Sequence, residues 1–81
     1  MKFNPHKYDI KVKRIFVDGE FFYESTVSEF IHVSDFHDTY QGAYDLMIDT
    51  LRMTKGVFDY HNFDFPKASK SWAVHHAKSA G

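Results

Sequence analysis

The side chains of this sequence that could do chemistry are its carboxylates and histidines. A two-metal nuclease needs several carboxylates that converge on a pair of Mg²⁺ ions, which activate water and stabilise the leaving oxygen. Asp45 or Asp49 on a helix, with Asp59 on a last strand, are the candidates for that role. Apolar residues occupy the core face of the first expected strand, where such a site would need an acid. We therefore expect a non-catalytic protein.

Six histidines raise the question of a metal site. Zinc needs three or four converging ligands, and the chain has no cysteine to supply any of them. The local groups are His37 with Asp35 and Asp38, and His61 with Asp59. Neither group supplies enough ligands on its own, so we expect no metal and no other cofactor.

The charges divide the chain into zones. Residues 1–14 and 51–81 are mainly basic, whereas residues 15–50 contain eight acidic side chains and no lysine or arginine. If the acids gather on one surface, they repel phosphates and attract a basic partner. The alternative is that the basic ends fold over this acidic zone and neutralise it. The eight acids are Asp18, Glu20, Glu24, Glu29, Asp35, Asp38, Asp45 and Asp49.

Length and composition predict one small globular domain. The 81 residues include 43% hydrophobic and 19% aromatic side chains, enough for a single packed core, which we place at residues 6–66. The absence of cysteine excludes a disulfide scaffold and indicates a reducing compartment. No apolar run approaches the ~20 residues that cross a bilayer, and residues 1–14 lack the apolar segment of a signal peptide. We expect a soluble cytoplasmic protein that does not contact a membrane.

A β-hairpin is the firmest structural expectation. Asp18-Gly19 suits a two-residue type I′ turn, because both positions tolerate positive φ. The turn fixes the register, in which Lys13 faces Glu24 on the solvent side. The face predicted to be core pairs Phe16 with Phe21, Arg14 with Tyr23, Val12 with Ser25 and Ile10 with Val27.

One amphipathic helix is predicted after the hairpin. Thr39 is a suitable N-cap, and Gly56 stands where a left-handed C-terminal cap is expected. The apolar residues at helical period are Tyr40, Ala43, Tyr44, Met47, Ile48 and Leu51.

Short apolar runs predict the remaining elements. Residues 30–33 are expected to form a third strand and residues 57–61 a fourth. Residues 63–66 form a loop that packs its aromatic rings. Residues 67–81 are expected to be a tail or a short helix capped by Ser69 or Ser71. The fold class is α+β, with an antiparallel three- or four-stranded sheet and one helix on its apolar face.

Five segments of the chain together resemble the HicB-like antitoxin domain. Their order and spacing, which cover roughly residues 8–69, carry the resemblance. The segments are Tyr8-Asp9-Ile10-Lys11-Val12, Val17-Asp18-Gly19-Glu20, Thr26-Val27-Ser28-Glu29-Phe30, Asp38-Thr39-Tyr40-Gln41-Gly42-Ala43 and Phe65-Pro66-Lys67-Ala68-Ser69.

This resemblance implies a β-β-β-α-β fold like a degraded ribonuclease H domain. It also implies a homo-dimer or higher homo-oligomer that belongs to a toxin-antitoxin system and blocks a small basic mRNA interferase. The chain departs from the family in two ways. Residues 67–81 are too few for the family's C-terminal DNA-binding module, so we expect no direct DNA binding without an added module. Gly42 replaces the glutamate that commonly completes the capping box at the helix start.

The predicted function is therefore that of an antitoxin-like, protein-binding inhibitor. Acids that point away from the core would steer and pair with a basic partner, and an exposed aromatic ring would anchor it. An alternative is an orphan homo-oligomeric regulatory protein, or a phage-borne inhibitor of a host enzyme. The residues predicted to bind the partner are Glu20, Phe22, Glu24, Asp35, Asp38, Asp45 and Asp49.

Overall fold

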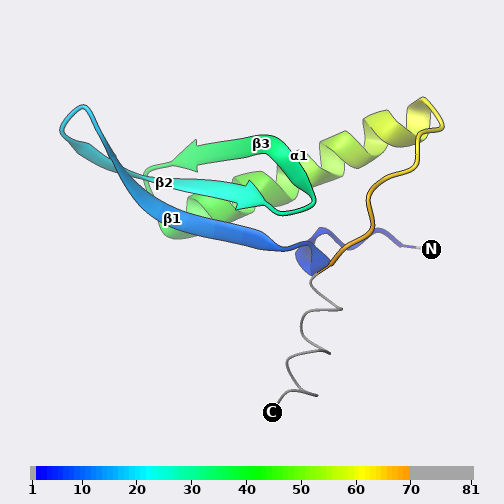
Figure 1. Cartoon of the computed structure of the whole chain (residues 1–81), viewed down its shortest axis with the longest axis horizontal. Helices are drawn as coiled ribbons and strands as arrows, with labels where there is room; N and C mark the ends of the chain where they lie inside the picture. Colours follow the sequence, from blue (N-terminus) through cyan, green and yellow to red (C-terminus); the bar gives the residue numbers. More distant parts are fainter. Residues whose placement is uncertain (1, 70–81) are drawn as a thin grey trace, which may run out of the picture.

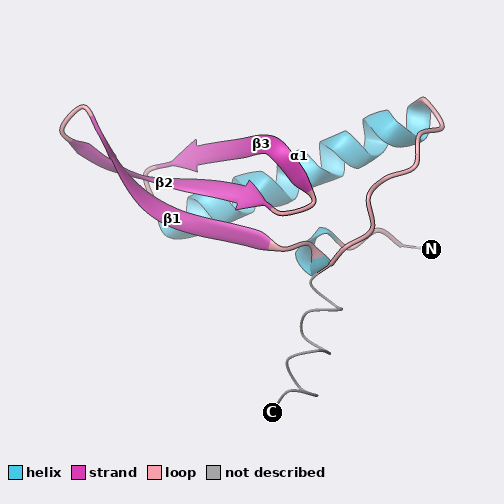
Figure 2. Cartoon of the chain, in the orientation of Figure 1, coloured by secondary structure: helices cyan, strands magenta, loops and turns pink. Residues whose placement is uncertain are grey.

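A computed structural model describes residues 2–69 as one sheet covered on one face by one helix (Figure 1). The sheet is antiparallel and has the strand order β1-β2-β3, and the fold is α+β. A short 3-10 turn, η1, precedes the sheet, and Figure 2 shows the helix running behind all three strands. The elements are η1 (Pro5–Lys7), β1 (Ile10–Val17), β2 (Glu20–Val27), β3 (Phe30–His37) and α1 (Tyr40–Tyr60).

The turn between β1 and β2 confirms the predicted hairpin. Asp18 and Gly19 both have positive φ, 51° and 81°, as a type I′ turn requires. The pairs on the predicted core face are all present, and Lys13 pairs with Glu24 on the opposite face. Local turn chemistry therefore set the register of the whole ribbon.

The pairing of β2 with β3 contains an irregularity that curves the sheet. Val27 pairs with Phe30, whereas Thr26 pairs with Ser34, so extra residues of β3 stand opposite one step of β2. One of these residues, Ile31, is 86% exposed. Phe30 and Val33, three positions apart at the start of β3, both pack against the core, which a regular strand would not allow.

The core lies between α1 and one end of the sheet. Its central cluster consists of Tyr8, Val27, Met47 and Leu51. The hairpin extends beyond the helix (Figure 1), so the core-face residues nearest its tip are not covered. Phe16 and Phe21 remain 62% and 55% exposed, although their rings contact each other at 4.8 Å. No helix in the described part of the chain has the length and apolar character needed to cross a membrane.

The predicted end of the helix and the predicted fourth strand are wrong. Gly56 lies inside α1, which continues to Tyr60 and so includes four of the five residues expected to form the strand. Helix propensity tolerates one exposed glycine, and Phe58 extends the apolar face of the helix by two turns beyond Leu51. The sheet therefore has three strands in the described residues. The alternation of apolar and polar residues at 57–61 does not correspond to a strand.

Asn62 ends the helix instead of Gly56. Its φ is 58°, and its backbone N–H donates to the carbonyl of Asp59 at 3.2 Å. The N–H of Phe63 donates to the carbonyl of Phe58 at 2.8 Å, and the two rings lie 6.1 Å apart. These two hydrogen bonds and the ring contact are the complete Schellman arrangement.

The segment after the helix returns along the core. Phe65 packs its ring against those of Phe3, Tyr8 and Phe58, with centroids 5.2–5.7 Å apart. The Tyr8 hydroxyl donates to the carbonyl of Pro66 at 2.5 Å. The expectation that this loop packs its rings is thus met by Phe65. The expected C-terminal helix lies outside the described residues from position 70 onward.

Candidate protein-binding surface

The sheet face turned away from α1 carries an apolar hollow. Its lining, which we call the outer-face patch, is Ile15, Val17, Phe22 and Phe36. The hollow has a volume of about 340 Å³, and no polar surface lines it. Strand alternation produces the patch, because these residues share one face of three neighbouring strands. An exposed apolar hollow is a candidate for an interaction site.

Acidic side chains of β2 stand on the same face as the outer-face patch. Glu20, Phe22 and Glu24 follow one another at every second position, so all three point to this side of the sheet. Glu20 is exposed, and Glu24 is half-buried beside Lys13, with Nζ and Oε1 3.8 Å apart. Three of the seven predicted residues are thus brought together.

Asp35 does not point away from the core, contrary to the expectation from the sequence. It lies on the face of β3 that α1 covers and is half-buried. Its Oδ2 accepts a hydrogen bond of 2.7 Å from the hydroxyl of Thr50 on α1. The burial pattern of β3 depends on the bulge, which no local sequence signal predicts. Asp35 therefore joins the sheet to the helix instead of presenting its carboxylate on the outer face.

The remaining predicted acids lie around α1. Asp38 precedes the helix, with its carboxylate 2.9 Å from Nδ1 of His37. Asp45 accepts a hydrogen bond from the Gln41 side chain at 3.0 Å, and Asp49 is exposed. Asp45 and Asp49 are exposed on α1, which covers the face of the sheet opposite the outer-face patch. The seven predicted residues consequently do not form one surface.

The sequence left open a second possibility, in which the basic ends fold over the acidic zone and neutralise it. One ion pair in the described residues connects a basic end with this zone. Among the ion pairs within residues 2–69, the pair of Lys13 with Glu24 joins the two zones. The other lysine pairs, Lys11 with Asp9 and Lys55 with Asp59, lie inside the basic ends. Most carboxylates of residues 15–50 are therefore left facing solvent or neutral groups.

The start of α1 explains why glycine occupies position 42. Thr39 caps the helix as predicted, accepting from the Gly42 N–H at 3.0 Å. Nδ1 of His37 accepts from the Thr39 N–H at 3.1 Å. In a capping box a glutamate at the position of Gly42 would accept that same N–H. A Cβ on Gly42 would lie 2.2 Å from the His37 ring, so glycine makes room for the histidine that replaces the glutamate.

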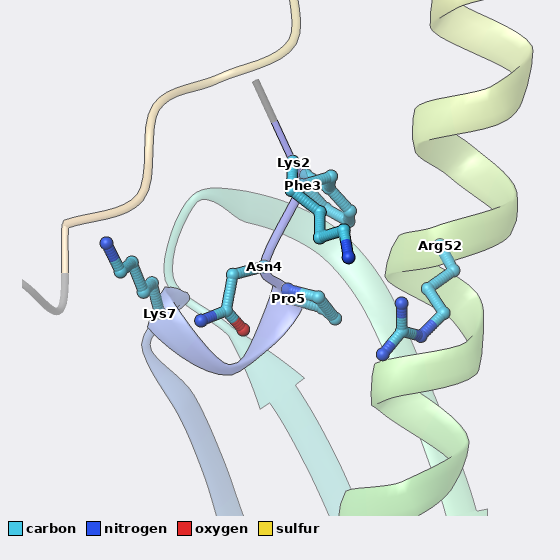
Figure 3. A pocket seen from close by; sticks show the side chains of 6 residues that line it. All are labelled: Lys2, Phe3, Asn4, Pro5, Lys7 and Arg52. Atoms are coloured by element: carbon cyan, nitrogen blue, oxygen red, sulfur yellow. The ribbon is translucent and has the colours of Figure 1, made fainter.

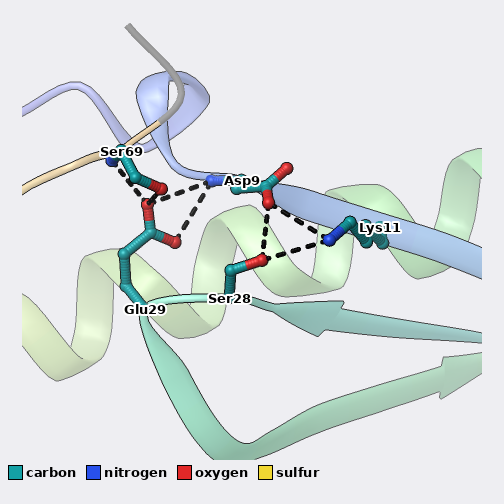
Figure 4. A network of polar contacts seen from close by, with 5 residues as sticks. All are labelled: Asp9, Lys11, Ser28, Glu29 and Ser69. Carbon is teal, nitrogen blue, oxygen red and sulfur yellow. Dashed lines mark hydrogen bonds and ion pairs between the residues drawn. The ribbon is translucent and has the colours of Figure 1, made fainter. Parts of the chain in front are cut away.

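A group of polar contacts that was not expected from the sequence ties the start of β1 and the segment after α1 to Glu29 (Figure 4). The Glu29 carboxylate accepts from the Asp9 N–H at 3.2 Å and from both the N–H and the hydroxyl of Ser69 at 2.6 Å. Burial, and secondarily the charge of Glu29, raises the pKa of Tyr8 above its ordinary value. These contacts hold the segment after α1 against the β2–β3 turn.

The described carboxylates and histidines are dispersed. Within residues 2–69, no three His, Asp or Glu side chains lie close enough to bind one metal ion. Asp59, expected on a strand, lies on α1, where its carboxylate accepts from Lys55 at 2.5 Å.

Comparison of the chain with models of protein families, with characterised proteins and with solved structures gave no match.

Proposed function

We propose that this chain is a non-catalytic, antitoxin-like inhibitor that binds a small basic protein of the mRNA interferase type and covers its active site. The observation that carries the proposal is the outer-face patch with Glu20 and Glu24 beside it. An apolar centre with charges at its rim is the usual anatomy of a protein-protein interface. The acids would speed association with a basic partner and orient it.

The HicB-like resemblance supports the choice of partner. The described order of elements, three antiparallel strands followed by a helix, is the first part of the β-β-β-α-β order that the resemblance implies. Residues 61–69 contain no strand to complete it. A chain without cysteine is suited to the cytoplasm, where the proposal places it.

The test is binding to the small basic protein encoded in the adjacent reading frame, measured by calorimetry at low salt. Phe22→Thr and the double variant Glu20→Gln/Glu24→Gln are expected to weaken binding about tenfold or more. The matched control is Asp45→Asn/Asp49→Asn, which removes the same charge from the solvent side of α1. It is expected to change the affinity by less than about twofold.

Two results would contradict the proposal. In one, the helix variant weakens binding while the two sheet variants do not, which would move the interface to α1. In the other, no small basic protein is encoded nearby, or its purified product fails to bind. Circular dichroism of each variant separates loss of binding from loss of folding.

A second candidate is a homo-oligomeric regulator, including a phage-borne inhibitor of a host enzyme. It is favoured by the edge strand β3, which carries no lysine or arginine and leaves Ile31 exposed. The other edge, β1, has Lys11, Lys13 and Arg14, charges that discourage edge pairing. Light scattering of the chain alone and mixed with the small basic protein distinguishes the candidates, because both can self-associate and only the first forms a mixed complex with that protein.

A further inference from the structure

A basic hollow lies where η1 meets α1, away from the outer-face patch. It has a volume of about 620 Å³, within the range of small-molecule pockets. A second hollow of about 380 Å³ adjoins it and shares part of its lining. We call the two together the cationic hollow. The residues that line the larger part are Lys2, Phe3, Asn4, Pro5, Lys7 and Arg52 (Figure 3).

The charges around the cationic hollow all have one sign. Lys2, Lys7, Arg52 and Lys55 line its two parts, and none of its lining residues is acidic. Lys55 is neutralised by Asp59. The other three cations form no ion pair with a carboxylate of the described residues. Three uncompensated cations beside one cavity raise its potential and attract an anion.

The backbone of η1, which presents Lys7, is held by its own hydrogen bonds and by a buried proline. Pro5 is fully buried, and the Asn4 side chain accepts from the His6 N–H at 3.0 Å. The N–H of Lys7 donates to the carbonyl of Asn4 at 3.2 Å, which closes the turn. Arg52 projects from α1, which is the longest helix or strand in the described residues. A ligand would therefore meet a preformed backbone at Lys7 and Arg52, which lowers the entropy cost of binding.

The directions of the side chains indicate the shape of the anion. In Figure 3, the side chains of Lys2 and Arg52 both extend into the space between the N-terminal segment and α1, near Pro5, whereas Lys7 points away on the other side of the turn. A single phosphate between Lys2 and Arg52 would leave Lys7 unused. A chain of phosphates can contact the first two cations and continue toward the third.

We infer that the cationic hollow binds a chain of two or more phosphate groups, supplied by inorganic polyphosphate or by the 5′ end of a nucleotide. The planar guanidinium of Arg52 can donate two parallel hydrogen bonds to one phosphate, and the ammonium groups of Lys2 and Lys7 act as point charges on the others. This ligand site goes beyond the proposed protein-binding function, since it uses a separate surface and the opposite sign of charge.

The test is calorimetric titration of the full chain with tripolyphosphate and, separately, with orthophosphate. Tripolyphosphate is expected to bind at least about tenfold more tightly than orthophosphate. Arg52→Gln and Lys2→Gln are each expected to weaken tripolyphosphate binding about tenfold. Lys13→Gln, which removes the same charge from the outer sheet face, is the matched control and should change the affinity by less than about twofold.

A third ligand identifies the source of the phosphates. Adenosine triphosphate that binds as tightly as tripolyphosphate would show that the phosphate chain alone is recognised, and tighter binding would show that the nucleoside contributes. Three results overturn the inference: no binding of either compound, equal weakening by Lys13→Gln and Arg52→Gln, or equal binding of a single-stranded oligonucleotide without terminal phosphates. The last would assign the hollow to a nucleic acid backbone.

Discussion

Replacing Gly42 with alanine should fail to stabilise α1, although alanine is the better helix former by up to about 1 kcal/mol. The new Cβ would lie 2.2–2.5 Å from three atoms of the His37 ring, a separation that atoms cannot keep. The ring must then rotate away and give up the Thr39 N–H, which costs about 1 kcal/mol. We expect the free energy of unfolding to stay the same or fall by about 1 kcal/mol.

The same substitution should become favourable once the ring is removed. In a His37→Ala background, Gly42→Ala is expected to raise the free energy of unfolding by about 1 kcal/mol. The coupling energy between positions 37 and 42 is then about 1–2 kcal/mol. Gly42→Glu in that background should stabilise further, because the glutamate can accept the Thr39 N–H.

Gly56→Ala is the matched control. This glycine also lies within α1, but a Cβ there would meet no atom within 4 Å. It should stabilise the protein by up to about 1 kcal/mol, or about 4–8 °C in Tm. Urea denaturation and thermal melts measure the stability of Gly56→Ala, of Gly42→Ala with and without His37, and of Gly42→Glu in the His37→Ala background. Equal stabilisation by Gly42→Ala with and without His37 would refute the assigned role of the ring.

Three other perturbations test the packing around α1. Tyr8→Phe loses the bond to Pro66 and should cost about 1 kcal/mol at neutral pH. Because folding raises the pKa of Tyr8, this contribution is fully present below about pH 10 and is lost as the pH rises through the raised pKa. The urea midpoints of variant and parent should therefore converge in alkali. Phe65→Ala should lower the free energy of unfolding by about 2–4 kcal/mol, measured by urea, because four rings lose their partner. Asn62→Ala should cost about 1 kcal/mol of stability and Asn62→Gly almost nothing, because φ is positive there; equal melting temperatures would argue against the Schellman cap.

The candidate interface was only partly visible in the sequence. Alternation along β2 placed Glu20, Phe22 and Glu24 on one face, since side chains of a strand alternate whatever surrounds it. Asp35 was misplaced because its direction depends on the bulge in β3, a feature of strand pairing. The cationic hollow was not predicted at all. It joins Lys2 and Lys7 to Arg52, about 45 positions later in the chain, and only the docking of η1 on α1 brings them together.

Short-range rules determined the hairpin, its register and the start and apolar face of α1. Each depends on residues within a few positions of one another, as with the turn at Asp18-Gly19 and the cap at Thr39. The tertiary structure decided where α1 ends, because burial of Phe58 among the core rings carries the helix past Gly56. It also decided which apolar face is covered: one helix shields one side of the sheet, and the other side remains open to solvent.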